Sequence, residues 1–163
     1  MRFFLAGIMQ GSHTAAVMHD QDYRLRIAAR LAACFPDAEI YDPLANHRKS
    51  IGYDKATGRE VFFHHNRMCR QVDVLVAFVP EASMGTAIEM WEAYQHGAAV
   101  VTISPLAHNW AVKFLSHALY ADEAALVAAL ESGQLAERIA EVLDARSDER
   151  KDLQTFPKKG ESP

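Results

Sequence analysis

The sequence of 163 residues is half hydrophobic and 23% charged, with a formal net charge of −4. This length suits one domain with its own core, and the acidic balance excludes a general attraction to nucleic acid polymers or anionic membranes. No apolar run reaches the roughly 18 residues that span a bilayer, and the first residues lack the order of a signal peptide. The sequence therefore predicts a cytoplasmic, single-domain protein.

In the first half of the chain, short apolar runs alternate with segments of helical periodicity. These patterns predict strands over 2–7 and 38–42 and helices over 22–34 and 60–71. The stretch over 43–59 is polar and irregular. A stretch of this length without secondary structure inside a compact domain is usually a functional or a disordered loop.

The clearest strand covers 73–79, where the apolar residues are continuous, as is typical of a parallel strand buried on both faces. The patterns that follow predict helices over 85–97, 109–116, 124–130 and 135–143 and strands over 98–103 and 118–120. After Asp144 the chain is charged and poor in apolar residues. This change predicts a domain over 1–145 and a disordered tail over 146–163.

The order of these elements predicts a single-domain α/β fold with a parallel five-stranded sheet and helices on both faces, of the flavodoxin or Rossmann kind. In such sheets, ligands bind at the carboxyl ends of the strands, where the strand order reverses. The loops at 7–13, 43–59, 80–89 and 104–110 are therefore expected to hold the functional residues.

The loop after the strand at 73–79 opens a helix. Ser83 is placed to cap that helix, Gly85 allows a ligand to approach the backbone, and Glu89 follows Ser83 by about one and a half turns. The first turn of a helix presents unpaired N–H groups, which suit a phosphate or a carboxylate. One interpretation is a capped helix with Glu89 on its solvent face. Because Ile88 and Met90 are among several apolar residues around this helix, the other interpretation, in which Glu89 faces a cleft, is favoured.

Three segments, Phe4–Gly7, Asp73–Ala77 and Ser83–Glu89, in this order and spacing resemble the nucleoside 2-deoxyribosyltransferase superfamily, which includes the nucleoside 5′-monophosphate N-glycosidases. Asn109 and the apolar run after it are similar to the C-terminal region of that superfamily. The resemblance covers roughly Phe3 to Leu130. It implies an enzyme that cleaves or transfers the N-glycosidic bond of a nucleoside or a nucleoside 5′-monophosphate, a hydrolase or a transferase.

The resemblance also implies roles for individual residues. Glu89 matches the nucleophile that attacks the anomeric carbon of the sugar, where an oxocarbenium-like transition state requires a fixed carboxylate. Members that act on free nucleosides carry aspartate at the position of Ser83, whereas the monophosphate glycosidases carry serine. The serine favours a nucleotide whose phosphate is held by Ser83 and the neighbouring N–H groups of Gly85 and Thr86.

Further contacts are implied outside this helix. Gly7, Gln10 and Ser12 belong to a first loop that suits the same ligand, although Ser12 is equally suited to cap a helix. Asn109 matches a residue that reaches into the site of a partner subunit, which implies a homodimer or a larger homo-oligomer. The alternative for Asn109 is a helix cap. Tyr53 and Asp54 are candidates to contact the base.

One departure from the superfamily concerns the proton that the leaving base needs. The superfamily has an aspartate at the position of His65 to deliver this proton. Histidine can act as a general acid near neutral pH, so His65, or its neighbour His64, is a candidate acid. The alternative is that His65 delivers no proton and the protein binds a nucleotide without cleaving it efficiently.

No cofactor or metal is predicted. The remaining histidines and the two cysteines, Cys34 and Cys69, lack the spacing of a metal site, and the P-loop and dinucleotide-binding motifs are absent. Two alternative functions stay open. Gly85, Thr86 and Glu89 also resemble part of the motif of the cytokinin-activating phosphoribohydrolases, and a nucleotide sensor without catalysis would use the same pocket.

Overall fold

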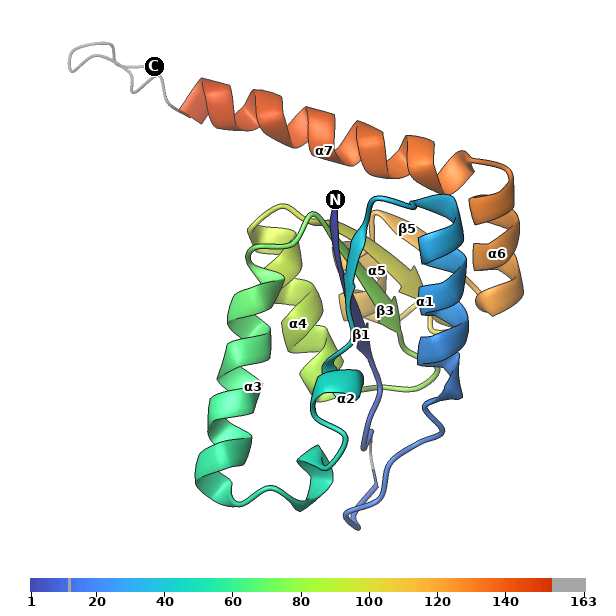
Figure 1. Ribbon diagram of the computed structural model, residues 1–163. Helices are drawn as coiled ribbons and strands as arrows, with labels where there is room; N and C mark the ends of the chain where they lie inside the picture. Colours follow the sequence, from blue (N-terminus) through green and yellow to red (C-terminus); the bar gives the residue numbers. More distant parts are fainter. Residues whose placement is uncertain (12, 154–163) are drawn as a thin grey trace, which may run out of the picture.

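The computed structural model describes residues 1–11 and 13–153. In this part of the chain, five parallel strands form one sheet in the order β2-β1-β3-β4-β5 (Figure 1). The strands are β1 (Arg2–Gly7), β2 (Glu39–Tyr41), β3 (Val74–Phe78), β4 (Ala99–Ile103) and β5 (Ala118–Tyr120). The predicted single-domain α/β fold with a five-stranded parallel sheet is confirmed.

Helices cover both faces of the sheet, as Figure 1 shows. On one face lie α1 (Asp22–Cys34), α6 (Glu123–Glu131) and the start of α7 (Gln134–Leu153), and their apolar residues pack on Phe3, Leu5 and Val76. On the other face lie α3 (Lys55–Cys69), α4 (Met84–Gln95) and α5 (Trp110–Leu115), which pack on the side chains that alternate with these, such as Phe4 and Leu75. Both faces of the central strands are therefore buried, which explains their continuous apolar runs.

The strand order places a reversal point beside β1. From β1 the chain moves to β2 at the edge, and β3 then lies on the other side of β1, with Gly7 in register with Phe78. The loops after β1 and β3 therefore leave neighbouring strand ends in different directions. This is the place where open parallel sheets form a ligand-binding crevice.

The predicted loop over 43–59 is wrong in part. It contains the short helix α2 (Pro43–Asn46) and the 3₁₀-helix η1 (Ser50–Gly52), and α3 begins at Lys55 instead of residue 60. Asp54 caps α3, because its carboxylate accepts hydrogen bonds from the N–H groups of Ala56 (2.8 Å) and Thr57 (2.9 Å). The first turn of α3 is polar, so its apolar periodicity did not reveal where the helix begins.

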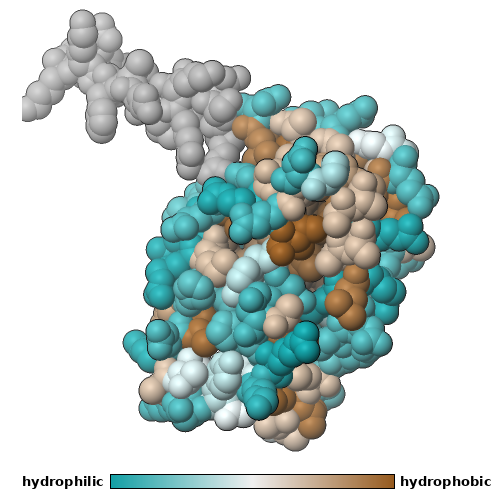
Figure 2. All heavy atoms as spheres, viewed as in Figure 1, coloured by the Kyte–Doolittle hydropathy of each residue, from teal (hydrophilic) through white to brown (hydrophobic). Residues whose placement is uncertain are grey.

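The last helix also extends further than predicted. Helix α7 continues to Leu153 and so overlaps the predicted tail over 146–163, whose remaining residues, 154–163, lie outside the described part of the chain. Figure 2 shows hydrophilic side chains over most of the face in view, with one group of hydrophobic side chains in its upper half. Within residues 1–11 and 13–153, no helix is both long and apolar enough to cross a membrane.

Candidate active site

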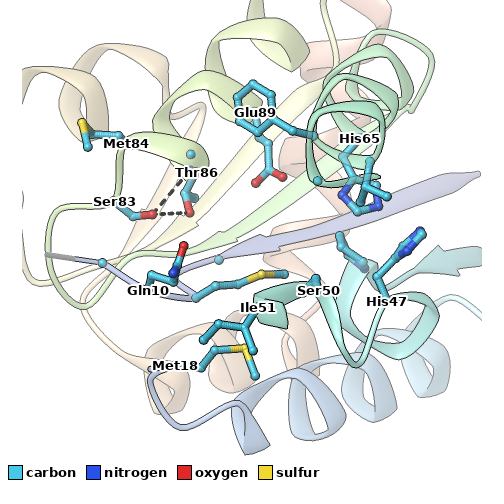
Figure 3. A pocket seen from close by; sticks show the side chains of 18 of the residues that line it. Gln10, Met18, His47, Ser50, Ile51, His65, Ser83, Met84, Thr86 and Glu89 are labelled. Carbon is cyan, nitrogen blue, oxygen red and sulfur yellow. Dashed lines mark hydrogen bonds between the residues drawn. The ribbon is translucent and has the colours of Figure 1, made fainter. Parts of the chain in front are cut away.

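A cavity of about 400 Å³ lies at the carboxyl ends of β1 and β3 (Figure 3). It is bounded by the loop after β1, the α2–α3 segment, the inner face of α3 and the first turns of α4. Its lining includes Gly7, Gln10, Met18, Arg24, His47, Ile51, Tyr53, Phe62, His65, Ser83, Met84, Gly85, Thr86 and Glu89. The cavity thus occupies the crevice that the strand order creates.

Most of the predicted site residues meet in this cavity. Gly7, Gln10, His65 and the four predicted residues within 83–89 all line it. Ser12 lies outside the described residues. Asn109 does not line the cavity: its exposed side chain caps α5 and accepts hydrogen bonds from the N–H groups of Ala111 (3.0 Å) and Val112 (3.3 Å).

One end of the cavity is formed by the N-terminus of α4. Ser83 is the N-cap, and its hydroxyl is hydrogen bonded to the hydroxyl of buried Thr86, at 2.9 Å. A Cβ atom added to Gly85 would meet no heavy atom within 4 Å, so the backbone there is open on the cavity side. Because the first N–H groups of a helix have no partner within the helix, this end offers donors to an anion.

Glu89 lies between the two ends of the cavity. Figure 3 shows its carboxylate pointing into the cavity, with Ser83 and Thr86 on one side and His65 on the other. The side chain is partly buried, and within the described part of the chain no hydrogen bond to its carboxylate is present. Burial raises the pKa of Glu89 from 4.5 to about 7, although the nearby Arg24 guanidinium opposes this rise. At neutral pH, both the ionised and the protonated carboxyl group are therefore populated.

Arg24 is the functional-site residue that the sequence analysis missed. Its side chain is only 2% exposed and reaches from α1 to the floor of the cavity. Its guanidinium donates hydrogen bonds to the carbonyl oxygens of Leu5 (2.8 Å) and Gly7 (3.2 Å) and to the carboxylate of Asp42 (3.0 Å). The guanidinium thereby links the end of β1 to Asp42, the residue that precedes α2. The signal that could have found it is an arginine on the apolar stripe of α1, one turn before Ile27.

The other end of the cavity is aromatic. Buried His65 has its Nε2 atom 3.3 Å from the hydroxyl of Tyr41, and the Nδ1 atom of His47 lies 3.2 Å from the hydroxyl of Tyr53. The rings of His47 and His65 are 5.1 Å apart between centroids. Burial is the main cause that lowers the pKa of His65 from 6.5 to about 4, and His47 adds to this effect. His65 is therefore a neutral imidazole at neutral pH.

Comparison with known proteins supports the architecture. A 2-deoxyribosyltransferase from Bacillus psychrosaccharolyticus has 16% identity and a TM-score of 0.57, with 75% of this chain and 87% of that chain covered. A conserved protein from Enterococcus faecalis V583 has 19% identity and a TM-score of 0.51, with 86% and 97% covered. This chain has the fold of that 2-deoxyribosyltransferase. The predicted resemblance to the nucleoside 2-deoxyribosyltransferase superfamily is thus confirmed at the level of the fold.

A third structure, the CMP N-glycosidase of Clostridium botulinum, has 16% identity and a TM-score of 0.47, with 80% of this chain and 98% of that chain covered. No family model and no curated protein sequence matches the chain. At 16–19% identity, these likenesses show the fold and not the roles of individual residues.

The described residues contain no cluster of three or more His, Cys, Asp or Glu side chains that could hold a metal ion. The cavity instead combines helix N-terminal donors, one carboxylate and an aromatic end in a single row. Such a row can bind an anion, present a carboxylate to an electron-poor carbon, and pack against a flat ring.

Proposed function

We propose that the protein cleaves or transfers the N-glycosidic bond of a nucleoside 5′-monophosphate or a nucleoside, with Glu89 as the nucleophile. The observation that carries this proposal is the position of the Glu89 carboxylate, between the N-terminus of α4 and the aromatic end of the cavity (Figure 3). The distinct chemistry of the two ends fits the distinct chemistry of the two ends of a nucleotide.

In this proposal, the 5′-phosphate lies at Ser83, Gly85 and Thr86, where helix N–H groups and two hydroxyls can donate hydrogen bonds to its oxygens. The base lies among His47, Phe62 and His65, and the sugar lies between the two at Glu89. The ionised carboxylate attacks the anomeric carbon and forms an ester while the base departs. Water or a second base then attacks the same carbon and releases Glu89.

We further propose that the active form is a homodimer in which Asn109 faces the cavity of the partner. The side chains beside Asn109 on α5 support an interface: Trp110 is 78% exposed and Phe114 is 57% exposed, and the two rings are in contact. Large exposed aromatic side chains next to each other are typical of protein–protein interfaces.

To test the proposal, the protein is incubated with each member of a panel of ribo- and deoxyribonucleoside 5′-monophosphates and the matching nucleosides. The free base that is released is then measured by chromatography. We expect release from one or more of them and its loss in Glu89→Gln. Glu92→Gln is the matched control, because Glu92 lies on the same helix but pairs with Arg70 at 2.8 Å outside the cavity. Equal release by wild type and Glu89→Gln would refute the assignment of the nucleophile.

A second candidate function is a nucleotide sensor without efficient catalysis. It is favoured by one observation, the neutral imidazole of His65 at the position of the expected acid. A sensor would raise its Tm with a nucleotide, because a ligand that binds only the folded state stabilises it. In the same panel, a rise in Tm without any free base would support this candidate.

A further inference from the structure

The aromatic end of the cavity, where the proposed function places the leaving base, has few groups that can supply a proton. Among the described residues that line the cavity, Glu89 is the only carboxylate. The other titratable side chains at this end are His47, Tyr53 and His65, and His64 stands exposed beside them. His47 and His65 each have a ring nitrogen engaged by a tyrosine hydroxyl, at 3.2 and 3.3 Å. At the place where a carboxyl group would have to donate a proton to the leaving base, tyrosine hydroxyls and imidazoles are instead hydrogen bonded to one another.

This lack of an acid matters because of how a base leaves a sugar. A neutral nucleobase takes the electron pair of the glycosidic bond and departs as an anion unless a proton is supplied, and such a proton accelerates reactions by about 10²–10⁴-fold. A heterocycle whose glycosidic nitrogen is already cationic takes the same electron pair and departs as a neutral molecule. Such a substrate needs no acid.

The charges around the cavity also suit a cationic ring. Phe62, Tyr53 and the imidazoles of His47 and His65 line the aromatic end, and aromatic faces attract cations. The one carboxylate, Glu89, lies next to this end. The Arg24 guanidinium on the floor is paired with the Asp42 carboxylate at 3.0 Å and donates hydrogen bonds to two carbonyl oxygens, so part of its charge is offset.

We propose that the preferred substrates of this site are cationic N-glycosides, namely 5′-monophosphates whose sugar is joined to a positively charged ring nitrogen, as in a ribosylated pyridinium or an N7-alkylated purine. The proposal rests on the proposed function. The bond between the anomeric carbon and the ring nitrogen breaks, its electron pair neutralises the ring, and a Glu89 oxygen forms an ester with the anomeric carbon. Water then cleaves the ester, yielding the free sugar phosphate, the neutral heterocycle and one proton.

The expected pH dependence follows from the groups that face the bound ring. Ionisation of Glu89 supplies the nucleophile, so the rate rises as the pH passes about 7. His47 and His64 stand beside His65 at this end. Protonation of His65, whose pKa is lowered to about 4, adds positive charge near a cationic ring and weakens its binding at low pH, in the same direction as the effect of Glu89. Arg24, which is paired with Asp42, lies on the floor of the cavity. No step needs a protonated group, so the rate has no falling limb between about pH 7 and pH 9.

The test uses matched pairs of substrates with the full chain. The first pair is 7-methylguanosine 5′-monophosphate and guanosine 5′-monophosphate, which differ by one methyl group and one charge. The second pair is nicotinamide mononucleotide and its reduced form, whose ring is neutral. We expect kcat/KM at least about 100-fold higher for the cationic member of each pair, in line with the acid catalysis that it does not need. Nicotinamide mononucleotide should also raise the Tm more than its reduced form does.

Cationic glycosides are intrinsically more reactive, so each rate is divided by the rate with Glu89→Gln, and Glu92→Gln serves as the control for the same chemical change. If Glu89→Gln fails to fold, Glu89→Asp replaces it. Release from neutral nucleotides as fast as from cationic ones, lost in the Glu89 variant, would refute this inference and leave the proposed function standing. No Glu89-dependent release from any substrate would overturn the proposed function itself.

Discussion

Replacing Glu89 with glutamine is expected to stabilise the protein at alkaline pH and to leave its stability unchanged in acid. The pKa of Glu89 in the folded protein, about 7, lies above the ordinary value of 4.5, so folding disfavours the ionised carboxylate. The wild-type protein therefore loses stability as the pH rises from 4.5 to about 7, and the loss is complete above that. Glutamine has nearly the same shape and cannot ionise, so the variant avoids this loss.

The size of the effect follows from the pKa shift. A shift from 4.5 to about 7 corresponds to about 3 kcal/mol at 1.36 kcal/mol per unit. Because the side chain is partly exposed, solvent reduces this figure, and we expect about 2 kcal/mol at pH 8 or above. For a chain of this size, that is a rise of about 4–8 °C in Tm.

The assay is thermal unfolding of wild type and Glu89→Gln side by side at about pH 4 and about pH 8. The quantity to compare is the difference in Tm between the two proteins at each pH, since other titrating groups cancel in it. The same difference at both pH values, or a variant that is less stable at about pH 8, would refute the argument that the cavity holds a desolvated carboxylate.

Three further predictions concern the cavity and its floor. For a neutral nucleotide or a cationic one, kcat/KM should rise with pH around a midpoint of about 7, as Glu89 ionises; a flat profile between about pH 6 and pH 8 would contradict its role as the nucleophile. Arg24→Met should lower the free energy of unfolding by about 3–5 kcal/mol, because it leaves Asp42 without its cation, and urea unfolding of Asp42→Asn beside it tests whether the pair is the cause. Gly7→Ala should cost about 1–3 kcal/mol, since the new Cβ atom would collide with the hydroxyl of Tyr23; an unchanged midpoint of urea unfolding would show that the Tyr23 ring moves aside freely.

Much of the fold could be predicted because the central strands are buried on both faces, and this burial is visible in their nearly continuous apolar sequence. The run over Val74–Phe78 is apolar at each position, since helices cover both faces of the sheet, and Ala99–Ile103 is apolar except for the buried Thr102. Parallel strands joined by helices then define where the loops gather. The position of Glu89 could be predicted for a related reason, because the apolar residues around α4 leave few places for a carboxylate other than the cavity.

What the sequence did not reveal depends on partners far away along the chain. Arg24 is buried because Leu5, Gly7 and Asp42 accept its hydrogen bonds. The sequence around Arg24 does not indicate that these three distant residues would be its partners. The start of α3 was missed because a cap at Asp54, and not an apolar period, determines it.

The strand order divides the cavity between two stretches of chain. Glu89 and the N-terminal end of the cavity belong to α4, which follows a central strand. The segment that follows the edge strand β2 carries the residues of the aromatic end, His47, Tyr53, Phe62 and His65. An edge segment can be lengthened, shortened or replaced with little effect on the interior, because few interior contacts depend on it. Under the proposed function, the nucleophile and the phosphate contacts thus lie on one segment, and most contacts to the base lie on another. If the proposed function holds, exchange of residues 43–62, which include His47, Tyr53 and Phe62 but not His65, is a route to a new leaving group.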